Sequence, residues 1–76
     1  MIRYYFDIRD DAGVSLDEEG LELDTQLDAE IEAAMSLADM AREFADIRRN
    51  VAVEVRTDAG DVFQAAFIFK RRETKQ

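Results

Sequence analysis

Hydrophobic and polar residues alternate along several short stretches of the chain, which is the period of a β-strand with one buried face. In residues 2–9 every second position is apolar, and a short apolar pattern resumes at Val14 and Leu16. Residues 51–57 and 61–69 show the same alternation. The pattern therefore predicts four strands, arranged as one pair near each end of the chain.

Both predicted strand pairs contain the same short turn. The chain reads Asp-Ala-Gly at residues 11–13 and again at residues 58–60. Asp bonds to nearby backbone amides and Gly accepts a positive φ, so each copy predicts a hairpin loop, a type I turn closed by a left-handed Gly. An ancient duplication and independent selection of one turn both explain the repeat, and the few matching residues favour the second.

A single helix is predicted between the two strand pairs, over residues 25–48. This span contains neither Pro nor Gly, either Asp24 or Thr25 caps its start, and Arg48 and Arg49 lie near the negative end of its dipole. The element order predicts an α+β fold, ββαββ, with a four-stranded antiparallel sheet and the helix packed on one face. A right-handed crossover gives the strand order 2-1-3-4. The order 2-1-4-3 stays open, because the aromatic fourth strand suits a central position.

Apolar residues cover more of this helix than one small sheet requires. The first apolar stripe consists of Leu27, Ile31, Ala34, Met35 and Ala38. A second stripe, displaced from it by roughly 120°, consists of Leu37, Met40, Phe44 and Ile47. Either the helix lies obliquely on a twisted sheet and buries both stripes, or the second stripe meets another subunit.

The fourth strand gives a parallel indication of self-association. A free sheet face normally alternates to polar residues, yet the face of this strand that points away from the helix is partly apolar. Two partly apolar surfaces on one small domain favour a homodimer. The predicted self-association residues are Leu37, Met40, Phe44, Ile47, Val62, Ala66 and Ile68.

The size of the chain strengthens this expectation. Its 76 residues make one domain, which we place at residues 1–69, followed by a basic and mobile C-terminal tail at residues 70–76. Domains this small gain stability from disulfides, a metal or a partner subunit. The absence of Cys and His excludes disulfides and removes the commonest metal ligands and general base. With neither a signal peptide nor a membrane span in view, we expect a cytoplasmic protein.

The charge of the chain is unevenly distributed. The formal net charge of −8 divides into −5 for residues 1–23, −4 for residues 24–50 and +1 for residues 51–76. An acidic body repels phosphate backbones, which disfavours nucleic acid as a partner. The opposing signals are a basic tail and a sheet face of basic and aromatic residues, where Asp7 and Glu54 cancel much of the positive charge. These two groups are Lys70, Arg71, Arg72 and Lys75, and Arg3, Tyr5, Arg9 and Arg56.

Candidate catalytic and metal-binding groups are few. The densest acidic patch is Asp17, Glu18, Glu19 and Glu22. Carboxylates at this spacing suit Ca²⁺ or Mg²⁺, but a calcium-loop pattern aligned on Gly13 places Ile8 and Ala12 where oxygen ligands belong, so a solvated loop is favoured. Asp7, Asp10 and Asp11 belong to the outer face of a strand or to a turn. We predict no catalytic, cofactor-binding or metal-binding residue, and no enzyme.

Three segments of the chain resemble a known family. They are MIRYYFDIRDD at the start, DEEGLEL at residues 17–23 and VEVRTDAGDV at residues 53–62. They are similar to a family of short bacterial proteins that is classed only as a domain of unknown function. The resemblance implies a bacterial origin and carries no known activity. Asp24 stands where the family pattern has Pro.

These observations favour a non-enzymatic interaction or regulatory module that forms a homodimer, with a further protein partner that the sequence does not identify. The alternative is an antitoxin-like or RNA-associated module that uses the basic tail and the open sheet face. The antitoxin likeness rests on the order of the elements alone, so it is an analogy of architecture.

Overall fold

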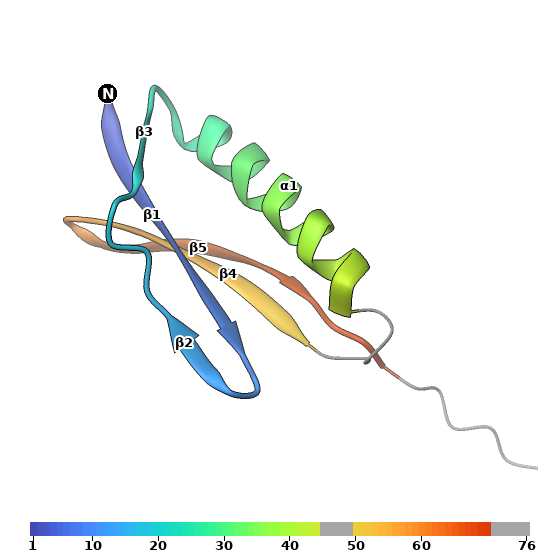
Figure 1. Cartoon of the computed structure of the whole chain (residues 1–76). Helices are drawn as coiled ribbons and strands as arrows, with labels where there is room; N and C mark the ends of the chain where they lie inside the picture. Colours follow the sequence, from blue (N-terminus) through green and yellow to red (C-terminus); the bar gives the residue numbers. More distant parts are fainter. Residues whose placement is uncertain (45–49, 71–76) are drawn as a thin grey trace, which may run out of the picture.

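One helix lies across one face of an antiparallel sheet (Figure 1). The computed structural model describes residues 1–44 and 50–70, with the side chain of Phe44 outside the description. The elements are β1 (Ile2–Asp10), β2 (Gly13–Ser15), β3 (Leu21–Leu23), α1 (Gln26–Phe44), β4 (Val51–Thr57) and β5 (Gly60–Phe67). The predicted α+β architecture is confirmed, with β3 as an additional short strand.

The two hairpins are closed by the same local interaction. In the first, the Asp10 carboxylate accepts a hydrogen bond from the Ala12 N–H at 2.8 Å. In the second, the Thr57 hydroxyl accepts one from the Ala59 N–H at 3.1 Å. The Gly that ends each turn has a positive φ, 136° at residue 13 and 126° at residue 60. Side-chain oxygens that bond a backbone N–H two residues on favour such turns, so the residue before each Asp-Ala-Gly motif helps to fix the turn.

The strand order resolves the alternative that the sequence left open. The sheet runs β2-β1-β4-β5, and every neighbouring pair is antiparallel. β4 lies between β1 and β5, and its alternate residues Val51, Val53 and Val55 are buried. This is the predicted order 2-1-3-4, and it leaves the aromatic last strand at an edge.

β3 pairs with the first part of β1, while β2 pairs with its last part. The registers are Ile2↔Leu23 to Tyr4↔Leu21 for β3 and Ile8↔Ser15 to Asp10↔Gly13 for β2. Both short strands therefore lie along one edge of β1, with residues 16–20 between them. Gly20, with φ of 73°, turns the chain into β3. An added Cβ there would stand 2.9 Å from Arg3 Cγ and 3.0 Å from the Tyr4 carbonyl oxygen, so this close approach requires Gly.

The core lies between α1 and the sheet. Thr25 caps the helix by accepting a hydrogen bond from the Asp28 N–H at 3.2 Å, which selects one of the two predicted caps. α1 contacts β4, β5 and β3. The fully enclosed cluster consists of Tyr4, Ala29, Ala33, Val53 and Val55. Two alanines one turn apart bring the helix backbone close to the valines of β4, and larger side chains from the sheet fill the remaining volume.

Candidate interaction surfaces

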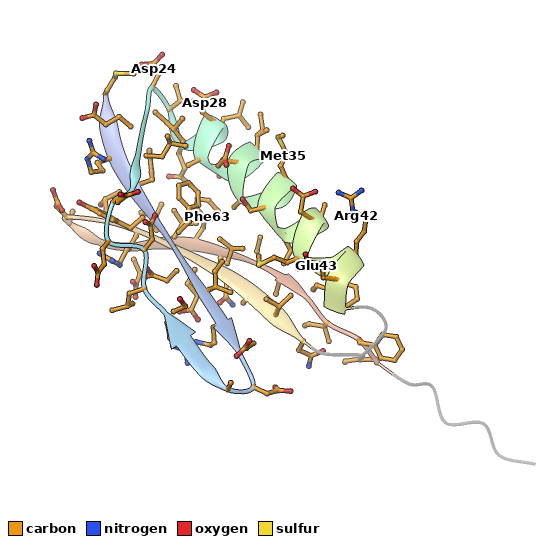
Figure 2. All side chains as sticks on the ribbon, viewed as in Figure 1. Asp24, Asp28, Met35, Arg42, Glu43 and Phe63 are labelled. Carbon is orange, nitrogen blue, oxygen red and sulfur yellow. The ribbon has the colours of Figure 1, made fainter. Side chains whose placement is uncertain are left out.

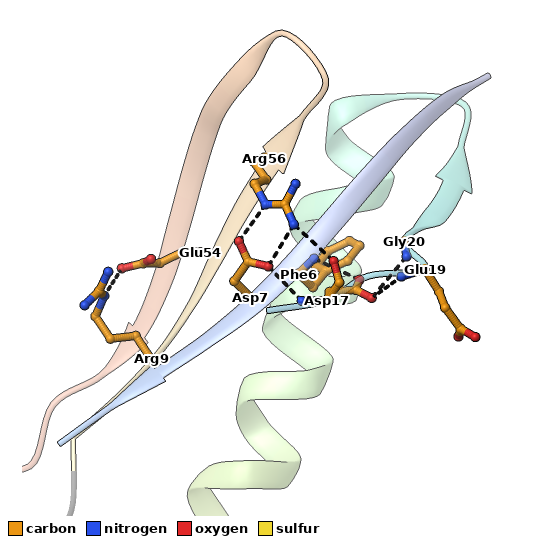
Figure 3. Close-up of polar contacts among 8 residues, drawn as sticks. All are labelled: Phe6, Asp7, Arg9, Asp17, Glu19, Gly20, Glu54 and Arg56. Carbon is orange, nitrogen blue, oxygen red and sulfur yellow. Dashed lines mark hydrogen bonds and ion pairs between the residues drawn. The ribbon is translucent and has the colours of Figure 1, made fainter. Parts of the chain in front are cut away.

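The sheet face opposite the helix carries a cluster of charged groups, which we call the polar cluster: Asp7, Asp17 and Arg56 (Figure 3). Asp7 is only 5% exposed. Its carboxylate accepts hydrogen bonds from Arg56 Nε at 2.8 Å and from the Asp17 N–H at 2.9 Å. The guanidinium also lies 4.5 Å from the centre of the Tyr5 ring. The hydrogen bond with Asp7 raises the pKa of Arg56 against the opposing effect of burial, so the arginine stays charged.

Asp17 fastens the loop between β2 and β3 to β1. One carboxylate oxygen accepts hydrogen bonds from the N–H groups of Glu19 and Gly20, at 3.1 and 3.0 Å. The other accepts one from the Phe6 N–H at 3.1 Å, and the Asp17 carbonyl oxygen accepts one from Arg56 at 3.1 Å. Burial acts to raise the pKa of Asp17, but these N–H groups and Arg56 outweigh it, so the pKa is lowered.

In the acidic segment, Asp17 thus has a structural role, because its carboxylate holds the loop against β1. The glutamates that follow it are on the surface. Glu18 and Glu19 are exposed, and Glu22 forms an ion pair with Arg3 at 3.5 Å. Within residues 1–44 and 50–70, acidic side chains form no group of three or more arranged to hold a metal ion. Both Asp17 oxygens are occupied by backbone donors, which is the role that the sequence did not reveal.

The remaining arginines of this sheet face are also engaged. Arg9 forms an ion pair with Glu54 at 2.6 Å (Figure 3). Both residues line an open hollow of about 390 Å³. Arg3 donates a hydrogen bond to the Glu19 carbonyl oxygen at 2.6 Å. Together with Arg42, which pairs with Asp39 on α1, all four arginines in the described part of the chain are ion-paired. The Arg side chains predicted for an RNA-binding face are therefore bound to carboxylates of this same chain.

The outer edge of β5, which we call the open edge, carries one charged residue, Asp61, near the start of the strand. β5 pairs with β4 on one side, and no described strand pairs with the other. Residues 62–69 contain no charged side chain and no Pro, the two usual protections of an edge strand. Ala66 is exposed, and Ile68, just beyond the strand, is 59% exposed. Both line an open hollow of about 250 Å³, together with Arg9, Asp10 and Asp11 of the first hairpin.

The apolar stripe of α1 that was expected to face the sheet is exposed, and described residues of the second stripe face the sheet instead. The side facing the sheet, here named the inner stripe, is Ala29, Ala33, Leu37 and Met40. The side facing away, the outer stripe, is Leu27, Ile31, Ala34, Met35 and Ala38, whose three large members are 63%, 51% and 61% exposed. Figure 2 shows Met35 pointing away from the sheet and Phe63 lying between sheet and helix. No helix among the described residues is both long and apolar enough to cross a membrane.

The predicted self-association residues are therefore divided between different environments. Leu37 and Met40 are half-buried and pack against the core of their own chain. Val62 is half-buried at a β-bulge, where Val55 and Arg56 of β4 pair with Phe63 and Asp61. Ala66 and Ile68 are exposed, while the Phe44 side chain and Ile47 lie outside the described residues. The outer stripe was missed because the sequence pattern did not show which stripe faces the sheet.

The sequence model of one protein family matches residues 3–68 of the chain. The chain belongs to the family described as Domain of unknown function (DUF6894). The predicted resemblance to a domain of unknown function is confirmed. No curated protein and no solved structure matches the chain. The DUF6894 match runs from Arg3 in β1 to Ile68 just beyond β5, so α1 and nearly all of both exposed surfaces belong to the family domain itself.

Proposed function

We propose that the protein is a small, non-enzymatic interaction module that self-associates, and that two copies pair antiparallel along the open edge of β5. The observation that carries this proposal is the outer edge of β5, which pairs with no described strand and whose residues 62–67 are uncharged and mostly apolar. An edge strand presents a row of backbone N–H and C=O groups, and a second identical strand satisfies them. Two-fold pairing joins the two sheets into one.

The side chains of β5 favour a register centred on Ala65. Its helix-facing residues Phe63, Ala65 and Phe67 lie opposite Val55, Val53 and Val51 of β4. In an antiparallel pair centred on Ala65, Phe63 of one copy faces Phe67 of the other. Gln64 then faces Ala66 on the opposite side of the sheet. Cross-strand aromatic pairs stabilise a sheet, and no like charges meet along this stretch.

Charge at the two ends of β5 also suits an antiparallel pair. Asp61 lies near the start of the strand, and the basic segment that begins at Lys70 follows its end. Antiparallel pairing brings the acidic start of one copy near the basic end of the other, at both ends of the interface. Opposite charges at an interface select orientation and partner. The same property disfavours a parallel arrangement, which would bring like ends together.

The alternative, an RNA-associated module, has less support from the same residues. Arg3, Arg9 and Arg56 are each bound to a carboxylate of the chain, and phosphate binding would have to displace those partners. The net charge of −8 opposes approach of a phosphate backbone. We therefore place the binding surface on the open edge.

The first test is the oligomeric state of the full chain by sedimentation velocity at tens of micromolar. Gln64→Lys combined with Ala66→Lys places like charges along the paired edge, and both positions are exposed in the single chain. We expect a wild-type dimer and a variant whose dimerisation is weakened by about tenfold or more. Ala12→Lys with Ser15→Lys is the matched control, because it adds the same charge to exposed positions of the first hairpin. A monomeric wild type, or a variant as dimeric as wild type, would contradict the proposal.

A second measurement tests the register itself. The chain contains no Cys, so single substitutions report specific pairs. We expect Gln64→Cys chains mixed with Ala66→Cys chains to form an intermolecular disulfide under mild oxidation more readily than either variant alone. Leu16→Cys, at an equally exposed position away from β5, is the control. Equal cross-linking in all mixtures would reject the register centred on Ala65.

A further inference from the structure

The outer stripe of α1 is a second apolar surface, and pairing along β5 does not use it. It lies on the side of the helix opposite the core, and its large members Leu27, Ile31 and Met35 are more than half exposed. Met35 projects from α1 away from the sheet in Figure 2. A surface helix on a single sheet normally presents polar residues on this side. A contiguous apolar stripe in that place is typical of a binding surface.

The spacing of the stripe matches the packing surface of another helix. Leu27, Ile31 and Met35 are four residues apart and form a ridge along α1. Ala34 and Ala38 belong to the neighbouring row at the same spacing, and their small side chains make a groove beside the ridge. Ridges of one helix packing into grooves of another at this spacing are the commonest mode of helix association in globular proteins. The occupant suggested by shape is therefore a helix.

The charge around the stripe indicates the chemistry of that helix. Between Gln26 and Phe44, α1 carries five acidic residues and one basic residue. The single basic residue, Arg42, is already paired with Asp39. The acidic residues lie on both borders of the outer stripe: Asp28, Glu32, Asp39 and Glu43 along one side and Glu30 along the other. A partner that covers the stripe therefore meets negative charge on each side.

A second copy of α1 does not supply the complementary charge. In an antiparallel pair of identical helices, each border meets the same border of the other copy, so Asp28 approaches Asp39. In a parallel pair, the border with Asp28 meets the border with Glu30. Both arrangements bring like charges together, which costs affinity. An anionic lipid surface is repelled for the same reason.

We infer that the outer stripe binds a basic amphipathic helix of another protein, with an apolar ridge seated beside Ile31 and Met35 and with Lys or Arg on its borders. Apolar contact supplies affinity, and the acidic borders select a basic partner and increase its rate of association. This surface is separate from the open edge of β5. The dimer proposed above would carry two such stripes.

The test uses the full chain and two synthetic helical peptides of 18 residues. Both have Leu along one face; the first has Lys at the bordering positions and the second has Glu. Fluorescence anisotropy of the labelled peptides gives Kd. We expect the Lys peptide to bind, the Glu peptide not to bind, and added salt to weaken the complex.

Variants locate the binding surface. Ile31→Gln with Met35→Gln should raise the Kd of the Lys peptide about tenfold or more. Leu16→Gln with Val14→Gln is the control, because it removes two exposed apolar residues from the first hairpin, and we expect no change in Kd. An equal loss in both variants, or none in either, would show only non-specific attraction to an acidic protein and would overturn the inference.

Further outcomes separate this inference from the proposed function. The Gln64→Lys and Ala66→Lys variant should bind the Lys peptide as wild type does, whatever its oligomeric state. If the substitutions at Ile31 and Met35 instead abolish dimerisation, the occupant of the stripe is a second copy, and the inference is wrong. Co-sedimentation with phosphatidylglycerol vesicles that is lost in the Ile31 and Met35 variant would likewise replace the helix by a membrane surface.

Discussion

The two edges of this sheet are treated in opposite ways. On one side the outermost strands are β2 and β3, which pair with different parts of β1, and the Asp17 carboxylate fills the gap between them by accepting the Phe6 N–H. On the other side of the sheet, no described strand pairs with the outer edge of β5, and residues 62–67 carry no charged side chain. The outer side of β1, which we call the closed edge, is thus covered by short segments and a buried ionic contact, whereas β5 is a full-length strand whose outer side pairs with no described strand.

The two sides of the sheet differ although both hairpins contain the same kind of turn. Asp10 and Thr57 accept equivalent hydrogen bonds from Ala12 and Ala59. The turn therefore fixes how each hairpin starts but not how its outer side is finished. β2 is only three residues long against nine in β1, so side chains and a second short strand complete that edge. β5 matches β4 in length and needs no such completion.

The largest expected effect comes from opening the closed edge at Asp7. Asp7→Ala removes the buried acceptor of Arg56 and of the Asp17 N–H. We expect a loss of about 2 kcal/mol in the free energy of unfolding, because the donors that remain are left partly desolvated. Urea unfolding followed by circular dichroism measures it. Glu54→Ala is the control on the same face, and since its partner Arg9 is more than half exposed, its cost should be much smaller. Equal costs would show that the polar cluster does not hold this edge.

A smaller effect is expected from Asp17→Asn, which keeps the shape of the side chain but removes its charge. The NH₂ group of the new amide then faces one of the N–H donors of Phe6, Glu19 or Gly20, so that one hydrogen bond is lost. We expect the free energy of unfolding to fall by about 1 kcal/mol. The closed edge should loosen, and hydrogen exchange at Phe6 should rise.

The pH dependence of the same contact has a definite sign. The folded-state pKa of Asp17 is lowered from its usual value, which is about 3.9 in an unfolded chain. Its stabilising contribution is therefore complete only above about pH 5 and is lost as the pH falls through the unfolded and then the lower folded pKa. Between about pH 5 and pH 2, wild type should lose more stability than Asp17→Asn, so that the difference between them shrinks. A constant difference over this range would refute the role of the ionised carboxylate.

The smallest effect on stability is expected at the open edge. Gln64→Lys with Ala66→Lys changes exposed side chains only, so unfolding of the dilute monomer should shift by less than about 0.5 kcal/mol. The same variant should lose self-association. A large loss of monomer stability would mean that the β5 edge supports the single chain, and the comparison between the two edges would then fail.

Much of the fold was predictable because local patterns carried it. The alternation in residues 2–9 and 51–57, the cap at Thr25 and the two Gly-closed turns all appear where the sequence placed them. β3 was not predicted, because three residues are too few to show the alternation of a strand. Its formation also depends on pairing with β1, which is distant in the sequence. The strand order depends equally on contacts between distant segments.

The exposed apolar surfaces were only partly predictable for a related reason. Ala66 and Ile68 were recognised from the apolar pattern of the last strand, and both are exposed. Leu37 and Met40, which were assigned to the same role, are half-buried and pack against the core of their own chain. Asp17 holds its loop against β1 by a hydrogen bond from the backbone N–H of Phe6, eleven residues away. No local sequence motif predicts such a contact.

The sequence by itself determined that the chain forms two hairpins around one helix and that the helix carries more apolar surface than one sheet can cover. Periodicity, turn residues and caps act between neighbours, so they can be read directly from the chain. Only the tertiary structure decided which stripe of α1 is inside. Tyr4 from β1 and Phe63 from β5 occupy much of the space between the layers, so the small side chains Ala29 and Ala33 fit against the sheet, and Leu27, Ile31 and Met35 are left facing outward.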